Sequence, residues 1–142
     1  MEKVFKTQSA EETAQVAREL AKTLKGGETL ALVGNLGAGK TAFVQALAQT
    51  LGVEERVTSP TFVYMHVHEL KNKTLKRLVH VDAYRGDAKT LLGIGLDEYL
   101  GDPETTVVIE WADRAEEILP AGTIFVRFLH AGGDVREIRL ES

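Results

Sequence analysis

The residues with the most recognisable chemistry form a glycine-rich segment between residues 34 and 41. The segment reads Gly-Asn-Leu-Gly-Ala-Gly-Lys-Thr and fits the pattern G-x-x-x-x-G-K-[ST] of a phosphate-binding loop. Glycine lets backbone N–H groups wrap a phosphate chain without Cβ clashes, Lys40 neutralises the β- and γ-phosphates, and Thr41 offers a hydroxyl to Mg²⁺. We therefore predict a site for a nucleoside triphosphate with Mg²⁺, whose contacts come from Gly34, Leu36, Gly37, Ala38, Gly39, Lys40 and Thr41.

Two acidic residues follow apolar runs that read as strands. Glu110 follows Val-Val-Ile, and Asp82 follows Leu-Val-His-Val. A phosphate-binding loop needs a carboxylate at the end of a neighbouring strand to hold Mg²⁺, directly or through water. The alternative for each acid is a surface role, as a helix cap or an ion-pair partner. We predict that Lys40, Asp82 and Glu110 are the catalytic residues, with one acid on the metal and the other on the attacking water, and the sequence leaves that assignment open.

An incomplete guanine-binding motif indicates which nucleotide the site binds. GTPases usually carry Asn-Lys-x-Asp, whereas residues 72–75 read Asn-Lys-Thr-Leu and lack the aspartate. ATP is therefore favoured. Thr61, after Ser59-Pro60, stands where many GTPases have a threonine that senses Mg²⁺ and the γ-phosphate, and a plain turn is the alternative.

Two other function classes remain open at this point. A small-molecule P-loop kinase would need an arginine-rich lid, but the candidate arginines are scattered: Arg85, Arg114, Arg127, Arg136 and Arg139. A nucleotide-dependent regulatory binder with negligible turnover would share the same loop. A metal cluster of His66, His68 and His80 is a further alternative, although cross-strand packing of these side chains is the favoured interpretation.

The elements that must position these residues follow from hydrophobic spacing and from turn residues. The pattern predicts a helix capped by Ser9 and ended by Gly26-Gly27, a buried strand over 29–33, and a helix from near Lys40 to Gly52. It then predicts a hairpin (62–70 and 75–81), a helical stretch capped by Asp87, a buried strand (105–109), a short helix (112–119) and a last hairpin (123–130 and 135–140). We expect one P-loop NTPase domain over residues 1–142, with a mixed, mostly parallel α/β sheet flanked by helices and extended by antiparallel hairpins.

Composition limits the environment and the partners of the chain. The 142 residues are 44% hydrophobic and include no cysteine, which excludes disulfides and thiolate-metal sites. The N-terminus lacks the apolar region of a secretory signal and no apolar run would cross a bilayer, so we expect a cytoplasmic protein with no membrane partner. A net charge of −4 argues against a direct grip on nucleic acid.

The motifs in combination resemble the TsaE family (formerly YjeE), the bacterial ATPases of tRNA threonylcarbamoyladenosine biosynthesis. The resemblance rests on four segments in the family's order: Leu-Gly-Ala-Gly-Lys-Thr (36–41), Ser-Pro-Thr-Phe (59–62), His-Val-Asp-Ala-Tyr-Arg (80–85) and Ile-Glu-Trp (109–111). It extends from Thr7 to about Arg139. Asn35, Ala83 and Ala112 depart from the family's usual Asp, Leu and Pro, and the first change puts any role of that side chain in doubt.

The resemblance implies a function within a complex. Family members act with TsaD and TsaB, which place the threonylcarbamoyl group on adenosine 37 of tRNAs that read ANN codons. The ATPase resets or regulates that complex, and tRNA contacts it only indirectly. The resemblance also implies that Glu110 is linked to the metal, that Asp82 supports the site or activates water, and that Trp111 lines the nucleotide or partner surface unless it is a core aromatic. Adenine or ribose contacts are implied near Thr7, Ser9, Glu11 and Arg136.

Overall fold

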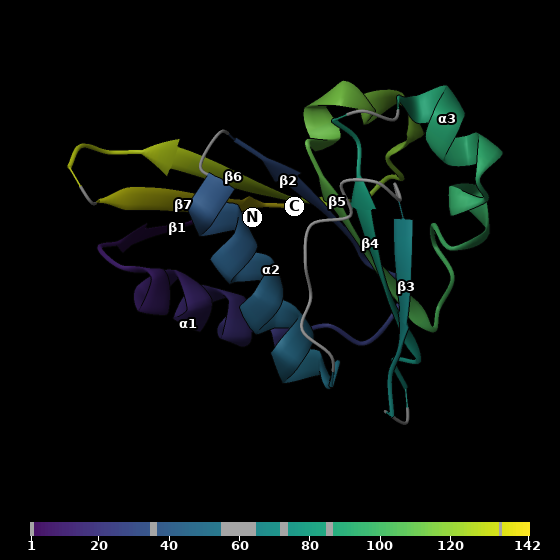
Figure 1. The fold of residues 1–142 in the computed structure, drawn as a ribbon, viewed down its shortest axis with the longest axis horizontal. Coiled ribbons are helices and arrows are strands. Elements are labelled where there is room, and N and C mark those ends of the chain that lie inside the picture. The colour runs from purple at the N-terminus through teal and green to yellow at the C-terminus, as the bar shows by residue number, and fades with distance from the viewer. Residues whose placement is uncertain (1, 35–36, 55–64, 72–73, 85–86, 134) are drawn as a thin grey trace.

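A mixed β-sheet of seven strands organises the part of the chain that the computed structural model describes, residues 2–34, 37–54, 65–71, 74–84, 87–133 and 135–142. The strands run in the order β1-β7-β6-β2-β5-β4-β3 (Figure 1). Their bounds are β1 Glu2–Thr7, β2 Thr29–Val33, β3 Met65–Glu69, β4 Arg77–Asp82, β5 Thr105–Glu110, β6 Ile124–His130 and β7 Arg136–Glu141. Strands β6, β2, β5 and β4 are parallel, and antiparallel pairs add β3 at one side and β7 and β1 at the other. The predicted mixed α/β sheet with hairpin additions is confirmed.

Helices cover both faces of this sheet. α1 (Ala10–Ala21) and α2 (Gly37–Leu51) lie side by side on one face, and α3 (Ala88–Gly93) lies on the other with three short 3₁₀ turns (Figure 1). These turns span Leu96–Glu98, Ala112–Arg114 and Glu116–Ile118. No helix in the described ranges has the length and apolar character needed to cross a bilayer.

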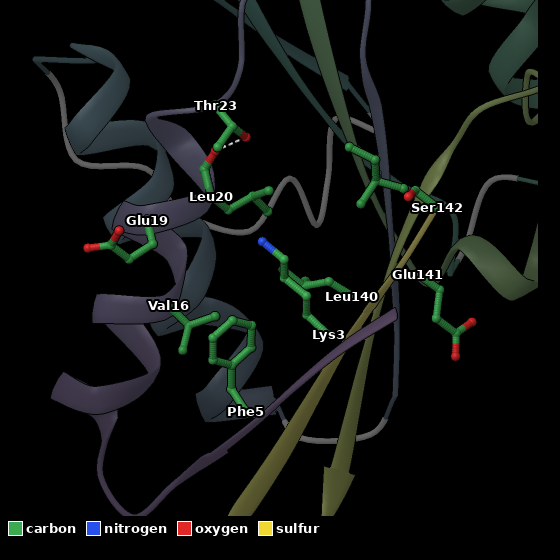
Figure 2. A pocket seen from close by; sticks show the side chains of 10 residues that line it. Lys3, Phe5, Val16, Glu19, Leu20, Thr23, Leu140, Glu141 and Ser142 are labelled. Atoms are coloured by element: carbon green, nitrogen blue, oxygen red, sulfur yellow. Dashed lines mark hydrogen bonds between the residues drawn. The ribbon is translucent and has the colours of Figure 1, made fainter. Parts of the chain in front are cut away.

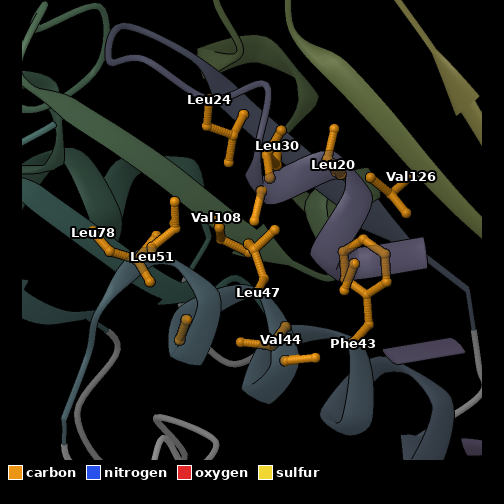
Figure 3. Packing of buried hydrophobic residues seen from close by; sticks show 14 of the residues in the cluster. Leu20, Leu24, Leu30, Phe43, Val44, Leu47, Leu51, Leu78, Val108 and Val126 are labelled. Carbon is orange, nitrogen blue, oxygen red and sulfur yellow. The ribbon is translucent and has the colours of Figure 1, made fainter. Parts of the chain in front are cut away.

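Alternation along the central strands divides the core into two layers. On β2, Leu30 and Leu32 belong to the cluster under α1 and α2, whereas Ala31 belongs to the cluster under α3. The first layer is seen in Figure 3, where Leu47 of α2 points toward Val108 of β5. Burial on both faces explains why β2 and β5 read as continuous apolar runs, as expected of central parallel strands.

The structure differs from three predicted helical segments, two of them at a helix end. α1 begins as predicted, with the Ser9 hydroxyl accepting from the Glu12 N–H, but it ends at Ala21, well before Gly26. The Thr23 hydroxyl donates to the Leu20 carbonyl and so satisfies an acceptor at the helix end. α2 begins at Gly37 and not near Lys40, because the N–H groups of a first turn need no intrahelical acceptor and glycine costs little there.

The third difference concerns the segment after β5. The predicted helix over 112–119 is two 3₁₀ turns, separated at Ala115, whose φ of −141° is outside the helical region. The predicted cap at Asp87 is confirmed, since its carboxylate accepts from the Thr90 N–H at 2.9 Å. That hydrogen bond lowers the pKa of Asp87.

Strand β1 was not predicted from the sequence. It pairs antiparallel with β7 at the edge of the sheet, and its residues up to Lys6 are exposed or half-buried. Lysines on an edge strand discourage pairing with other chains but blur the alternation that signals a strand. Thr7, the last residue of β1, is buried, and its hydroxyl lies 3.0 Å from that of Thr13 on α1.

The glycine that opens the phosphate loop is required by packing as well as by backbone conformation. Gly34 has a φ of +131°, and a Cβ on it would lie 2.4 Å from the Phe128 carbonyl oxygen on β6. Gly52 offers a matched comparison, because its φ is +104° and no atom lies within 4 Å of a Cβ added there.

We predict that Gly34→Ala destabilises the protein more than Gly52→Ala. Both variants incur left-handed strain of about 1–2 kcal/mol, and only the first adds an overpacking cost of about 1–3 kcal/mol. Urea unfolding of the two variants and the wild type measures the difference. Equal losses of stability in the two variants would contradict the close approach of Gly34 to β6.

Candidate functional site

The carboxyl ends of three parallel strands meet at the edge of the sheet where α2 begins. In the register, Glu110 of β5 stands opposite both Leu32 of β2 and Asp82 of β4. The chain leaves β2 through Gly34, and α2 carries Gly37, Gly39, Lys40 and Thr41 in its first turns. The structure thus brings Gly34, the start of α2 and the two predicted acids to one place, the position where open α/β sheets bind ligands.

Lys40 has an unusual environment for a cation. Only 2% of its surface is exposed, and its Nζ has no hydrogen-bond partner and no ion pair with any described residue. Burial lowers the pKa of Lys40, and the nearby carboxylates of Glu110, Asp113 and Asp82 oppose that shift. A buried donor without an acceptor is costly, so this position fits an anionic group that would supply acceptors.

The ammonium of Lys40 lies over the ring of Trp111, 3.7 Å from its centroid. Trp111 follows β5 directly and adopts a left-handed conformation with φ of 58°. Its ring packs against Tyr84 at 4.8 Å, and the Arg114 guanidinium lies 4.4 Å from the Tyr84 centroid. A cation–π contact of this kind stabilises a desolvated cation by about 2 kcal/mol. The sequence left Trp111 either at the nucleotide surface or in the core, and it both contacts Lys40 and packs on the α3-side core.

Both predicted acids are largely buried and each has a hydrogen-bond donor. Glu110 is 8% exposed, and its Oε2 lies 2.6 Å from Nε2 of His80. Asp82 is 7% exposed, and its Oδ1 accepts from the Tyr84 N–H at 2.8 Å. Among the described residues, neither acid is a surface helix cap or pairs with a lysine or arginine, the alternatives that the sequence offered. Their catalytic and metal-binding roles stay predictions.

The donor set suits a metal that is shared with phosphate. In the described part of the chain no group of three His, Asp or Glu side chains could hold a metal ion. Mg²⁺ is commonly held by one or two carboxylates together with substrate phosphates and waters. Glu110 and Asp82 provide such carboxylates, and the exposed Thr41 provides a hydroxyl at the start of α2.

The histidines show only part of the predicted cross-strand packing. His66 stands opposite His80 in the register of β3 and β4, and its ring lies edge-on to that of His68. The contact that sequence reasoning missed is the one between His80 and Glu110, which lie on neighbouring parallel strands. The motif His-x-Asp-x-Tyr-Arg at residues 80–85 was the sequence feature that singled out His80, but it does not indicate which residue the histidine contacts.

The residues predicted to contact the base or ribose lie farther along the same edge. Arg136 begins β7, opposite His130 at the carboxyl end of β6 and opposite Thr7 at the end of β1. Each residue has a structural partner: Ser9 caps α1, Glu11 pairs with Arg18 at 2.8 Å, and Arg136 donates to the Gly133 carbonyl. The hydrogen bond from Arg18, and then its charge, lower the pKa of Glu11. Nucleotide contacts by these residues stay predictions.

Several residues of the sequence prediction lie outside the described residues. They are Asn35, Leu36, Thr61 and Arg85, together with Ser59, Pro60, Asn72 and Lys73. The predicted roles of Leu36 and Thr61 therefore stay predictions.

A pocket lies at the opposite edge of the sheet, at the amino ends of the parallel strands. It occupies 330 Å³ between α1 and the sheet, and Figure 2 shows Phe5, Val16, Leu20 and Leu140 around it, with the Lys3 side chain among them. β1 begins and β7 ends at this edge, far along the strands from Gly34. No residue of the predicted site lines the pocket, so it is not part of the candidate site.

Comparison with known proteins identifies relatives over nearly the whole chain. The family model described as "Threonylcarbamoyl adenosine biosynthesis protein TsaE" matches residues 7–138. The "tRNA threonylcarbamoyladenosine biosynthesis protein TsaE" of Bacillus subtilis is 37% identical over 134 residues, covering 94% of this chain and 82% of the relative. The protein of the same name from Streptomyces coelicolor is 39% identical over 125 residues, covering 87% and 82%.

A solved structure shares the fold. The crystal structure of YdiB from Bacillus subtilis matches with a TM-score of 0.80 at 34% identity, and the match covers 99% of this chain and 84% of that one. This similarity confirms the predicted α/β fold of the P-loop NTPase class.

We predict that Lys40→Met leaves the nucleotide-free protein at least as stable as the wild type at pH 7.5 while it abolishes ATP binding. The variant replaces a buried, unpaired ammonium by an apolar chain of similar length. Burial lowers the pKa of Lys40 in the folded state, so the unfolded chain binds more protons than the folded chain just below pH 10.5. The free energy of unfolding of the wild type should therefore rise relative to that of the variant as the pH rises into that window. Urea unfolding at pH 7.5 and pH 10 and calorimetry with ATP are the measurements.

A loss of more than about 2 kcal/mol of stability in Lys40→Met would show that the ammonium stabilises the folded chain. Unchanged ATP affinity in the same variant would remove Lys40 from the nucleotide site.

Proposed function

The chain belongs to the TsaE family of threonylcarbamoyl adenosine biosynthesis proteins, and we propose that it binds ATP with Mg²⁺ and hydrolyses it in support of that tRNA modification. The observation that carries the proposal is the buried ammonium of Lys40, without an acceptor, at the start of α2 and among three carboxylates. A triphosphate supplies the missing acceptors, and Lys40 then neutralises phosphate charge that these carboxylates would otherwise repel.

Each residue of the site has a defined part in this proposal. The backbone N–H groups of the loop and of the first turn of α2 bind the phosphate oxygens, with support from the positive end of the helix dipole. Glu110 and Thr41 would hold Mg²⁺, and Asp82 would orient the attacking water. Bound Mg²⁺ supplies Lewis-acid stabilisation of the phosphate charge. Adenine is proposed over guanine because the Asn-Lys-x-Asp motif is incomplete.

The arrangement of arginines disfavours the kinase alternative. Arg127 pairs with Glu141 at 3.0 Å, Arg139 pairs with Glu137 at 2.7 Å, and Arg114 lies on Tyr84. An arginine-rich lid needs side chains that can turn toward a transferred phosphoryl group, and these three are engaged elsewhere. Water is therefore proposed as the acceptor of the phosphoryl group.

We predict that Glu110→Gln and Asp82→Asn each lower the kcat of ATP hydrolysis by about 100-fold or more, with a change in the Kd for ATP of less than about threefold. Most of the affinity is expected from the loop N–H groups and Lys40, whereas hydrolysis also needs a placed metal and water. Phosphate release and calorimetry separate the two effects. Asp113→Asn is the matched control, because Asp113 is an exposed carboxylate near Lys40 that does not end a strand.

Wild-type hydrolysis in both Glu110→Gln and Asp82→Asn would show that neither acid takes part in the reaction. A loss in Asp113→Asn as large as in the other two would attribute the effect to overall charge near Lys40.

The partners are proposed to be TsaD and TsaB, with tRNA held by the complex. The net charge of −4 argues against a direct grip on tRNA. An exposed Tyr84 beside Arg114 is the type of pair that proteins favour at interfaces, and it is continuous with the Trp111 and Lys40 contact. Partner binding at this surface would therefore act on the lysine that binds phosphate. A cytoplasmic location, where tRNA is modified, goes with this proposal and with the absence of cysteine.

We predict that the chain joins TsaD and TsaB only when ATP is bound, and that it hydrolyses ATP slowly without them. Sizing chromatography of the mixture with and without ATP and Mg²⁺ measures the association, with Lys40→Met as the variant that cannot respond. Complex formation that is indifferent to both nucleotide and variant would contradict the coupling.

A further inference from the structure

We propose that His80 is a positioning residue for Glu110, which it keeps away from Lys40 so that the lysine stays available to phosphate. The inference rests on the proposed function of the site. It concerns a contact that neither the phosphate-loop pattern nor the two acids predict.

The contact is short, buried and set by the sheet. β4 and β5 pair in parallel, with His80 opposite Val108 and Asp82 opposite Glu110. Residues two apart on a strand share a face. His80 therefore lies on the same face of the sheet as Glu110, at the level of Val108, two residues before Glu110 on β5. The distance from His80 Nε2 to Glu110 Oε2 is 2.6 Å, and His80 is 2% exposed.

We assign the tautomer of His80 from its hydrogen-bond partner. An ionised Glu110 can only accept, so Nε2 carries the hydrogen. Nδ1 is buried and has no hydrogen-bond partner among the described residues. The arrangement therefore fits an Nε2–H of His80 that donates to the Glu110 carboxylate.

The position of Lys40 shows what this hydrogen bond prevents. Glu110 is near enough to influence the pKa of Lys40, yet the two form no ion pair within 4.0 Å. Lys40 lies instead on the Trp111 ring. Glutamate and lysine both have flexible side chains, and in a water-excluded site their attraction is strong. Without the His80 donor, Glu110 would turn to Lys40 and neutralise the cation that phosphate requires.

The first test is made without nucleotide. Long-range ¹H–¹⁵N spectra of the wild type report the ring tautomer of each histidine. We expect His80 with hydrogen on Nε2, and we expect its ring signals to change in Glu110→Gln. His80 with hydrogen on Nδ1, or ring signals that do not respond to Glu110→Gln, would overturn the proposal whether or not the protein binds ATP.

The second test is a double-mutant cycle on ATP affinity measured by calorimetry. His80→Leu removes the donor at similar volume, and His80→Gln keeps an N–H at the equivalent position along the side chain. We expect His80→Leu to weaken ATP binding about tenfold, His80→Gln to bind within about threefold of the wild type, and His80→Leu/Glu110→Gln to recover the affinity of Glu110→Gln alone.

The recovery in the double variant distinguishes positioning from a loss of packing. If His80→Leu weakens binding equally with and without Glu110→Gln, or does not weaken it, the proposal is wrong. A wild type that binds no ATP would contradict the proposed function and, with it, the role of His80 toward phosphate. The nucleotide-free spectra would still show whether His80 holds Glu110.

Discussion

Parallel hydrogen bonding joins β4, β5 and β2, and it brings Asp82, Glu110 and the start of the phosphate loop to one edge of the sheet. The side-chain period of a strand is two residues, so a slip of one residue in this register would send His80 and Glu110 to opposite faces. The apolar residues that precede them, such as Val108 under α2, resist such a slip because it would exchange the side chains of the two core layers and disrupt the packing of both. The packing of the core therefore fixes the geometry of the site.

Among the described residues of the site, two polar atoms are buried without hydrogen-bond partners, Nζ of Lys40 and Nδ1 of His80. Most buried polar groups in proteins are hydrogen-bonded, so each exception calls for an explanation, and a ligand that supplies the missing partner is one. Here Trp111 partly compensates by offering its ring to the ammonium, and it does so from a left-handed backbone conformation that itself costs free energy. These features lower the local stability of the folded chain, and they leave the Lys40 ammonium available to bind an anion.

The sequence predicts the elements whose signals are local. Ser9 and Asp87 mark helix starts through capping, and the apolar runs of β2 and β5 mark buried parallel strands. β1 escapes prediction because an exposed edge strand needs no clear alternation. The contacts of Lys40 with Trp111 and of His80 with Glu110 escape it for another reason: each joins residues 30 or more positions apart, and only the register of the sheet brings them together.

A crystal structure with a non-hydrolysable ATP analogue and Mg²⁺ tests the central claim most directly. The account predicts that the phosphates lie against Gly34 and the first turn of α2, with Lys40 Nζ about 3 Å from a phosphate oxygen and withdrawn from the Trp111 ring. It also predicts that Glu110 remains bonded to His80. Phosphates bound elsewhere on the molecule, or an ammonium that stays over Trp111 while the analogue is bound, would contradict the account.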